Sequence, residues 1–410
     1  MRIAVTGASG FIGRQLVPLL KARGCDILLV GRDPAKLNIL FPSMETTTYT
    51  GLWQMAAGFD ALLHLAVLNN DQVADRAEFD RVNLDLPVEL CQNAQAAGIG
   101  TFIFISSTHT LDRGNKTNYA ASKRGAVERL AETGGIRKWV LHLPAVVGDE
   151  LAGKLAVADR LPAPLRGLAV LVLGSLKPTV HVSHLADTIV DLEPFEGNGI
   201  RQCIVADGQR DNPIFSKTKR FIDLAFAISI VLLLWWAMII IWVAIKLQSP
   251  GPGIFRQRRV GRNEEEFTCL KFRTMLVSAP NVGTHEVPVA AVTPIGHFLR
   301  RTKLDELPQV INILRNQMSL VGPRPCLPNQ TDMILERRSQ GVFEIKPGIT
   351  GLAQVRGIDM SDPAGLALCD REYLQLQSLV LDAKIILQTA TGAGSGDKVV
   401  KDTSSYRNAL

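Results

Sequence analysis

The sequence predicts an α/β protein of two domains with a membrane-embedded helix between them. A glycine-rich turn follows the first apolar strand, which is typical of a Rossmann-like, doubly wound parallel sheet. Residues 224–245 form an apolar run of about 22 residues, long enough to cross the hydrocarbon core of a bilayer. At 410 residues the chain is long for one domain and comfortable for two. We therefore divide it into a nucleotide-binding domain over 1–211, a linker and membrane helix over 212–246, a second domain over 247–391 and a disordered tail over 392–410.

The charge balance favours an anionic partner. The formal net charge is +6, which suits a membrane surface, a nucleotide or a phosphate. Nucleic acid would fit the same charge, but the sequence holds no helix-turn-helix, zinc-finger or RNA-binding motif, so we expect no nucleic-acid partner. The six cysteines are scattered, with no close pair for a metal site or a disulfide framework, which indicates a reducing, cytosolic environment. No cleaved signal peptide is visible, because Met1 leads directly into a strand.

The first domain begins with a candidate cofactor turn. Residues 1–5 form a short apolar strand, and Leu16, Leu19 and Leu20 continue after the turn with helical spacing. Glycines at such a strand-to-helix turn let backbone N–H groups approach a pyrophosphate at the positive end of the helix. A tight turn without a ligand is the alternative, but the position between the first strand and the first helix favours cofactor binding. The predicted cofactor-binding residues here are Gly7, Gly10, Phe11, Ile12 and Gly13.

The end of the next strand bears on the choice of cofactor. Residues 26–30 read as that strand, and Arg32 and Asp33 follow it closely. An acidic residue directly at the strand end favours the ribose hydroxyls of NAD(H), whereas Arg32 there favours the 2′-phosphate of NADP(H). Asp33 lies one position further on, so NADP(H) is preferred and NAD(H) stays open. Residues 60–66 read as a buried strand approaching the cofactor, in which we expect His64 to be structural.

Three side chains further along suggest acid–base chemistry. Residues 101–105 form a strand that leads to Ser107, and Tyr119 and Lys123 then share one helix face at positions i and i+4. The Lys123 ammonium can lower the pKa of the Tyr119 phenol, which would make Tyr119 a proton donor or acceptor near neutral pH. Ser107 would hydrogen-bond a substrate carbonyl or hydroxyl. Taken singly, each of the three also has an ordinary structural explanation.

Together with the glycine turn, these residues resemble the extended short-chain dehydrogenase/reductase family. Residues 143–148 and 181–187 look like the substrate-side elements of that family. The resemblance implies a nucleotide-sugar epimerase, dehydratase or 4-keto reductase that uses NADP(H) or NAD(H). We prefer a reductase, while an epimerase or dehydratase, or a non-catalytic nucleotide-sugar-binding module, stays open. The segment 148–179 is short, which leaves the extent of the sugar pocket open.

The apolar run is flanked by basic residues on both sides, namely Lys217, Lys219 and Arg220 before it and Lys246, Arg256, Arg258 and Arg259 after it. Because basic flanks favour the cytoplasmic side, both ends are expected there, and a bent, re-entrant helix satisfies this. Residues 234–237 at the centre include no proline that would force a kink, so a spanning helix stays open. Asp223, just before the run, would be costly in lipid and is expected at the interface. Residues 254–275 mix basic and apolar types, as a surface-associated segment does.

The most informative stretch of the second half is Thr302-Lys303-Leu304-Asp305-Glu306-Leu307-Pro308-Gln309. It places two adjacent carboxylates, Asp305 and Glu306, among basic residues. Adjacent carboxylates repel, so holding both ionised requires a basic side chain or a bound metal close by. A carboxylate can also attack phosphorus and carry a covalent phosphoryl group. The stretch therefore suggests phosphoryl chemistry at a membrane surface, and a solvated charged turn that begins a helix is the alternative.

The surrounding motifs resemble the bacterial sugar transferase family, the monotopic phosphoglycosyl transferases. The resemblance covers roughly 217–391 and rests on five segments in order: 255–257, 271–275, 302–309, 318–325 and 346–355. It implies a small α+β domain, a re-entrant membrane helix and a UDP-sugar substrate. It also implies that Asp305 attacks the β-phosphate of the UDP-sugar, with Glu306 as its partner and Mg²⁺ bound by both carboxylates. UMP leaves, and undecaprenyl phosphate then takes the phosphosugar.

Further residues are candidates for phosphate or substrate binding. Arg324 lies in a Gly-Pro-Arg-Pro turn held rigid by two prolines, which suits phosphate binding. Thr350 lies between two glycines in a turn whose backbone could hold the nucleotide or its phosphate. Two positions depart from the family, since Lys303 replaces a common serine and Asp370 lies where an acidic-aromatic pattern is usual. The full set of these candidates is Lys271, Arg273, Arg301, Arg324, Thr350 and Asp370.

These inferences combine into a bifunctional enzyme at the cytoplasmic face of a bacterial inner membrane. The first domain would reduce a nucleotide sugar, and the second would pass a sugar 1-phosphate to undecaprenyl phosphate. That transfer would start a surface glycan such as an O-antigen or an exopolysaccharide. The exact sugar, and whether the chain forms a homodimer, stay open.

Overall fold

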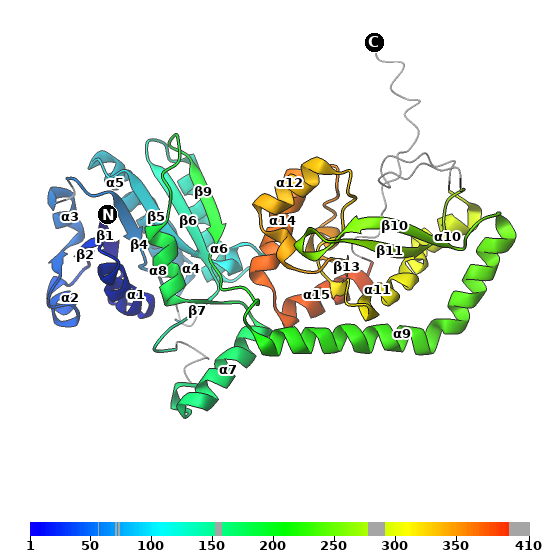
Figure 1. The fold of residues 1–410 in the computed structure, drawn as a ribbon. Helices are drawn as coiled ribbons and strands as arrows, with labels where there is room; N and C mark the ends of the chain where they lie inside the picture. The colour runs from blue at the N-terminus through cyan, green and yellow to red at the C-terminus, as the bar shows by residue number, and fades with distance from the viewer. Residues whose placement is uncertain (56, 70–71, 73, 152–157, 278–291, 393–410) are drawn as a thin grey trace, which may run out of the picture. The chain divides into compact units, whose positions relative to one another are not determined.

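The computed structural model describes residues 1–392 except 56, 70–71, 73, 152–157 and 278–291 (Figure 1). Its internal packing divides the chain into two compact units. The first unit comprises Met1–Gly174 and Pro178–Gly208, and the second comprises Ser175–Lys177 and Gln209–Leu410.

The first unit is built on a parallel β-sheet. Among the described residues, seven strands pair in the order β3-β2-β1-β4-β5-β6-β9, and every pairing is parallel. The run from β3 to β6 is the strand order of a doubly wound dinucleotide-binding sheet, so the predicted fold class is confirmed. The strands are β1 (Arg2–Thr6), β2 (Asp26–Val30), β3 (Glu45–Thr47), β4 (Ala61–His64), β5 (Thr101–Ser107), β6 (Arg137–Leu143) and β9 (Ile200–Ile204).

Helices cover both faces of this sheet (Figure 1). Alternate residues of β1 enter different cores, because Ile3 packs with α1 and α8 on one face while Ala4 packs with α5 and α6 on the other. Burial on both faces explains why the strands read as nearly continuous apolar runs. The helices between β1 and β9, of which α7 lies outside the sheet, are α1 (Phe11–Ala22), α2 (Pro34–Leu40), α3 (Tyr49–Met55), α4 (Arg76–Asp80), α5 (Leu86–Ala96), α6 (Asn118–Glu132), α7 (Ala163–Leu176) and α8 (Val182–Val190).

A smaller element lies outside this sheet. Strands β7 (Ala145–Val147) and β8 (Thr179–His181) pair in parallel. Helix α7 packs next to them through Ala169 and Val170, which contact the cluster of Val147, Leu151 and Ala158. Most of the short predicted segment 148–179 is therefore taken up by one helix, apart from the part that lies outside the described residues.

The second unit begins with one long helix, α9 (Pro213–Gln248), followed by an antiparallel hairpin of β10 (Ile254–Val260) and β11 (Glu266–Phe272). The segment expected to lie along a surface is thus a strand pair. Exposed and buried side chains alternate along β10, since Arg258 is exposed while Gln257 and Arg259 are buried. The rest comprises α10 (Pro294–Thr302), η7 (Leu304–Gln309), α11 (Val310–Leu314), β12 (Ser319–Val321), α12 (Thr331–Ser339), β13 (Gly348–Thr350), α13 (Leu352–Val355), α14 (Pro363–Leu376) and α15 (Leu379–Ala390).

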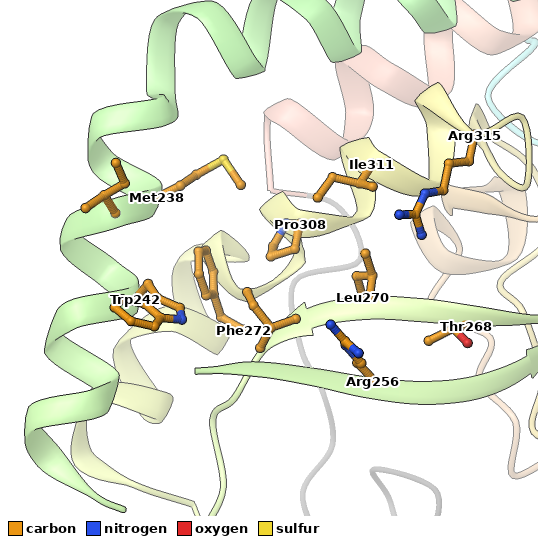
Figure 2. A pocket seen from close by; sticks show the side chains of 11 residues that line it. Met238, Trp242, Arg256, Thr268, Leu270, Phe272, Pro308, Ile311 and Arg315 are labelled. Atoms are coloured by element: carbon orange, nitrogen blue, oxygen red, sulfur yellow. The ribbon is translucent and has the colours of Figure 1, made fainter. Parts of the chain in front are cut away.

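Helix α9 is continuous and bends, so that it has two arms (Figures 1 and 2). The first arm packs through Ala227 against Ile313 of α11. The second packs through Ile245 against Phe272 of β11. The only proline of α9 is in its first turn, so proline does not cause the bend, and the packing of both arms on the same unit fits it. The helix is long and apolar enough to cross a membrane, and only 6% of its most apolar window is buried.

The start of α9 is fixed to the unit by a buried polar network. Asp223 accepts hydrogen bonds from Ser319 Oγ at 3.0 Å and Leu320 N at 2.8 Å. One turn earlier, Lys219 Nζ lies 2.5 Å from Asp382 Oδ2. Asp223 is 3% exposed, and the hydrogen bonds from Ser319 and Leu320 satisfy its carboxylate inside the protein, so no lipid contact is needed at the start of the apolar run.

Candidate functional site

Three glycines bring the two downstream motifs of the second unit into direct backbone contact. A Cβ at Gly348 would lie 2.1 Å from Gly322 N, and a Cβ at Gly351 would lie 2.2 Å from Gly322 O. The approach allows Gly322 N to donate to Thr350 O at 2.8 Å, and Gly348 N to donate to Pro323 O at 2.9 Å. Glycine is thus needed here for space, and the Gly-Pro-Arg-Pro turn is held against β13.

Two buried arginines hold the backbone of the same turn. Arg337 Nη1 donates to Arg324 O at 2.7 Å, and Arg259 Nη1 donates to Pro325 O at 2.9 Å. Arg337 is itself fixed by an ion pair with Asp370, at 2.7 Å between Nη2 and Oδ2. Sequence reasoning assigns neither arginine a site role, because the partners of each are distant in the chain. The two side chains position Arg324.

The acidic pair lies on η7, directly after a residue in a strained conformation. Lys303 has φ +56°, in the left-handed region that disfavours side chains with a Cβ, and it ends α10 and begins η7. Asp305 and Glu306 follow in the first turn, and Asp305 is 9% exposed. The alternative of a solvated charged turn does not describe this arrangement, since Glu306 Oε1 lies 2.7 Å from Lys271 Nζ and both side chains are 19% exposed.

A small cavity next to the acidic pair carries more positive than negative charge. It is lined by Arg259, Cys269, Lys271, Glu306, Gln309, Arg324, Pro325, Gly348, Ile349 and Gln354. Burial and the neighbouring charge of Arg324 together lower the pKa of Arg259 to about 10. Two guanidinium groups that face one cavity favour an anionic ligand, which would relieve their repulsion. The charges around the cavity therefore favour an anion beside Glu306, although its volume of about 10 Å³ is too small for a phosphate group unless the lining side chains move apart.

The electrostatic balance at Glu306 gives a testable pH dependence. Burial alone would raise the pKa of Glu306, but the charges of Lys271 and Arg324, with the Lys271 hydrogen bond, lower it from 4.5 to about 2. Because the pKa is depressed in the folded state, ionised Glu306 stabilises the fold above about pH 4.5, and this stabilisation is lost as the pH falls towards 2.

We therefore expect Lys271→Met to destabilise the protein most at neutral pH. The difference in thermal stability between the wild-type chain and this variant, measured in detergent micelles, should narrow as the pH falls from about 4.5 to about 2. Arg301→Gln is the control, because Arg301 is exposed on α10 and does not line the cavity. A difference that stays constant across this pH range would contradict the assignment.

Four of the predicted phosphate-binding residues do not line the cavity. Arg273 donates to Ser249 O at 2.8 Å and to Pro250 O at 2.6 Å, so it fixes the chain after α9. Arg301 is exposed on α10. Thr350 Oγ1 lies 2.6 Å from Thr389 Oγ1, and Asp370 pairs with Arg337. Lys271 and Arg324 do line the cavity.

The carboxylates fit a magnesium ion only if a substrate completes its coordination. Among the described residues, no cluster of three or more His, Cys, Asp or Glu side chains could hold a metal. Mg²⁺ is commonly bound by one or two carboxylates together with substrate phosphates and water. Asp305 and Glu306 would supply the two carboxylates, and Lys271 and Arg324 of the adjacent cavity would lie near the phosphates.

A second cavity, an apolar groove, lies between the second arm of α9 and the β10–β11 hairpin (Figure 2). Its volume is about 580 Å³. Met238 and Trp242 form an apolar end, whereas Arg256 and Arg315 lie towards the other end (Figure 2). Pro308 of η7 also lines the groove, so the short helix that carries the acidic pair borders both cavities. Such a groove suits an amphipathic, anionic ligand.

In the first unit, the glycine turn has the geometry of a cofactor cradle. Gly7 has φ +76°, and a Cβ there would lie 2.4 Å from Ala66 N of the chain after β4. A Cβ at Gly13 would lie 2.5 Å from the Ala8 backbone, so the helix packs tightly on the turn. Gly10 caps α1 without a side chain, and Phe11 and Ile12 are its first two residues. These features leave the N-terminal N–H groups of α1 accessible to a pyrophosphate, so the turn fits a dinucleotide.

The proposed acid–base residues of the first unit also lie together. Tyr119 is hydrogen-bonded to Ser107, and Lys123 Nζ is 5.5 Å from the centre of the Tyr119 ring. Lys123 Nζ donates to Ile105 O at 2.7 Å. The expected effect of Lys123 is wrong, however. Burial raises the pKa of Tyr119 despite the Ser107 hydrogen bond, and burial lowers the pKa of Lys123 to about 7, so the ammonium that is expected to stabilise a phenolate is only partly charged near neutral pH.

The residues near the cofactor strands have separate roles. Asp33 accepts a hydrogen bond from Lys36 N at 3.1 Å and caps α2, whereas Arg32 is exposed at the end of β2. His64 is 1% exposed and its Nδ1 lies 2.7 Å from Thr6 Oγ1, in agreement with a structural histidine. Burial lowers its pKa to about 3, so it is neutral. Because the Asp33 carboxylate caps α2, Arg32 remains the candidate for binding the 2′-phosphate of NADP(H).

The fold and the two sites define a class of protein: a Rossmann-like unit joined to a unit that has a long apolar helix and a carboxylate pair next to a cationic cavity. Residues 214–395 match the family model described as bacterial sugar transferase, and residues 3–190 match the NAD dependent epimerase/dehydratase family. The exopolysaccharide production protein ExoY of Rhizobium meliloti is 35% identical over 197 residues, which are 43% of this chain and 85% of that protein. The chain belongs to the bacterial sugar transferase family.

Other relatives are matched over less of their length. The UDP-glucose:undecaprenyl-phosphate glucose-1-phosphate transferase of Caulobacter vibrioides is 38% identical over 180 residues, covering 42% of this chain and 67% of the relative. The protein of the same name from Xanthomonas campestris is 38% identical over 192 residues, covering 44% of this chain and only 39% of that relative. These similarities concern the second unit.

Similar solved structures concern the first unit. A short-chain dehydrogenase/reductase superfamily protein from Agrobacterium tumefaciens with bound NAD is 17% identical, with a TM-score of 0.39, covering 50% of this chain and 77% of the other. Bordetella bronchiseptica WbmG in complex with NAD and UDP is 18% identical, with a TM-score of 0.39, covering 50% of this chain and 72% of the other.

Proposed function

We propose that the second unit transfers a sugar 1-phosphate from a UDP-sugar to undecaprenyl phosphate and releases UMP. The observation that supports this most is the Asp305–Glu306 pair on η7, beside a cavity with Lys271 and Arg324. A carboxylate nucleophile next to a cationic phosphate site is what phosphoryl transfer through an enzyme-bound phosphoester requires. Relatives of this unit are named for transfer of glucose 1-phosphate to undecaprenyl phosphate.

The reaction proceeds in two displacements at one phosphorus atom. A carboxylate oxygen of Asp305 attacks the β-phosphorus of the UDP-sugar, the bond to the bridging oxygen breaks, and UMP leaves with that oxygen. A phosphate oxygen of undecaprenyl phosphate then attacks the same phosphorus and releases Asp305. Lys271 and Arg324 offset the phosphate charge, and Arg337 and Arg259 keep Arg324 in place. Asp305 and Glu306 would hold Mg²⁺, which when bound neutralises phosphate charge.

The apolar groove is suited to the lipid acceptor. Its apolar end at Met238 and Trp242 would take isoprene units, and Arg256 and Arg315 would face the phosphate. The groove and the cationic cavity share η7 as a wall, since Pro308 lines one and Glu306 the other. The lipid chain and the UDP-sugar would thus lie on different sides of η7, while the acceptor phosphate would take the position that UMP vacates, since each in-line displacement places the entering oxygen opposite the bond that breaks.

The enzyme would work at the cytoplasmic face of the bacterial inner membrane, with α9 as a re-entrant helix. Both arms of α9 pack on the same unit, which keeps the two ends of the helix on one side. The exposed side chains of its central part are large and apolar, including Leu232, Leu233, Trp235 and Trp236. Bending and apolar exposure together favour insertion into one leaflet over a complete crossing.

The first unit would reduce a 4-keto nucleotide sugar before the second unit uses it. NADPH or NADH, when bound at the turn of Gly7, Gly10 and Gly13, supplies the hydride. Tyr119 would donate its phenolic proton to the C4 oxygen, which Ser107 would orient through a hydrogen bond. Lys123, fixed on Ile105 O, would position the ribose of the cofactor. Hydride and proton together convert the ketone to an alcohol. Because both units are in one chain, the nucleotide sugar that the first unit produces would be available as the substrate of the second unit.

We expect Tyr119→Phe to remove reduction without affecting transfer. Loss of the proton donor should slow NADPH consumption with a UDP-4-keto-6-deoxy sugar by about 10²–10⁴-fold. UMP release from a ready-made UDP-sugar should stay at the wild-type rate. If the wild-type chain interconverts UDP-sugars without net reductant, the unit is an epimerase or dehydratase. If Tyr119→Phe leaves glycan formation in cells unchanged, it is a nucleotide-sugar-binding module.

UMP release tests the transferase directly. The full chain in detergent micelles, given a panel of UDP-sugars, should release UMP repeatedly only when undecaprenyl phosphate and Mg²⁺ are present. Without the lipid, UMP should not exceed one molecule per enzyme, since Asp305 is then occupied. Absence of UMP with every UDP-sugar, from a chain that still unfolds cooperatively, would refute the proposal.

A further inference from the structure

We infer that α7, which belongs to the first unit except for its last two residues, is an additional membrane contact of this chain, lying in the headgroup region of the bilayer. The inference rests on the proposed attachment of the chain to a membrane through α9. It concerns a different surface, on the unit that carries the candidate cofactor turn.

The outer face of α7 is an exposed apolar stripe. Leu165 and Leu168 are three positions apart and are both 51% exposed, and Leu161 just before the helix is 41% exposed. Leu176, the last residue of α7, is 40% exposed and belongs to the second unit. The inner face of α7 is packed against the protein, because Ala169 and Val170 contact the cluster around Leu151. Exposed leucines on one helix face indicate a surface that contacts a membrane or another protein.

The charges around α7 favour an anionic lipid surface as that phase. From Arg160 to Ala186 the sequence has no acidic residue, whereas Arg160 and Lys177 lie at the two ends of the stripe. Asp159, the nearest carboxylate before the stripe, pairs with Arg166 at 2.9 Å. Leucines between cationic ends are the pattern of a helix that lies in the interface plane, with basic side chains directed to the phosphates.

The length of α7 sets how it can meet the bilayer. A helix of 14 residues extends about 21 Å, which is too short to cross a hydrocarbon core of about 30 Å. It can therefore only lie on the surface. A short interfacial helix binds weakly alone, but α9 in the same chain raises its effective concentration at the bilayer. This contact would keep the first unit near the membrane, where the second unit uses nucleotide sugars.

Spin labels on the full chain test this inference. The background variant is Cys203→Ser, because the other five cysteines are buried. Single cysteines replace Leu165 or Leu168 on α7, Ile39 on α2 as an apolar control that is 79% exposed, and Leu233 on α9 as a membrane reference that is 69% exposed. The labelled chain is placed in nanodiscs of phosphatidylethanolamine and phosphatidylglycerol, and the accessibility of each label to oxygen and to a water-soluble nickel complex is measured.

Labels at 165 and 168 should report a depth of about 5–10 Å below the headgroup boundary, whereas the label at 39 should report water. If 165 and 168 match 39 while 233 reports lipid, the inference fails and the attachment through α9 stands. If 233 also reports water, both fail. If 165 and 168 are shielded from both reagents, another protein surface such as a second copy covers α7, and the membrane contact is refuted.

Discussion

Asp305→Asn should abolish UMP release, by on the order of 10⁴-fold or more, as loss of a covalent nucleophile does in other enzymes. An amide cannot attack the β-phosphorus, and it is also a poorer ligand for Mg²⁺. The fold should be unaffected, since the replacement has the same shape at a position that is 9% exposed. The measurement is UMP release by the full chain with a UDP-sugar and undecaprenyl phosphate.

Two further variants make this result specific. Arg301→Gln alters a charge near the pair in the chain but outside the cavity, and should retain nearly full activity. Arg324→Lys keeps the charge but loses the planar fork that can bind phosphate in two places, so it should retain only a small part of the activity. An Asp305→Asn chain with more than a few per cent of the wild-type rate would exclude Asp305 as the nucleophile.

Asp370→Asn should reduce the free energy of unfolding of the second unit by about 3–5 kcal/mol. Arg337 and Asp370 are 2% exposed each, and Arg337 Nε and Nη2 both donate to Asp370 Oδ2, at 3.0 and 2.7 Å. Removal of the carboxylate charge leaves a buried guanidinium without its counter-charge. Chemical unfolding of the full chain in detergent micelles measures the loss.

The double variant Arg337→Met/Asp370→Leu separates stability from positioning. Apolar replacement of a buried pair is often close to neutral, so this variant should regain most of the stability. It should still release UMP slowly, because the bond from Arg337 Nη1 to Arg324 O is gone. Arg338→Gln is the matched control, since the Arg338–Glu264 pair is exposed and its loss should have a much smaller effect. Equal effects of Asp370→Asn and Arg338→Gln would contradict this account.

The parts of the fold that could be predicted are those with a local signature. The glycine turn and the strand over Asp26–Val30 depend on neighbours in sequence, and the structure has them as predicted. Tyr119 and Lys123 likewise share one helix, α6, because i and i+4 residues always meet on a helix. The motif around Asp305 could be identified because its residues are adjacent.

The parts that could not be predicted depend on contacts between distant residues. The sequence makes Asp370 a candidate for substrate binding, but its carboxylate accepts a hydrogen bond from Arg337, which lies 33 positions away in the chain. The charge of Arg273 makes it a candidate for phosphate binding, but its guanidinium donates hydrogen bonds to the carbonyl oxygens of Ser249 and Pro250. No proline marks the bend of α9 in the sequence. The two arms of the helix pack in separate core clusters, and these contacts join residues that are far apart in the chain. The pKa of Tyr119 depends on burial, which the sequence does not reveal.

The most direct test of the central claim is the mass of the intact chain after incubation with a UDP-sugar and Mg²⁺ in the absence of undecaprenyl phosphate. We expect a chain heavier by one hexose phosphate, with the added mass on the peptide that contains Asp305, and we expect this mass to be lost when undecaprenyl phosphate is added. A chain that turns over UDP-sugar with the lipid but never gains this mass would show direct transfer between the substrates and would contradict the account.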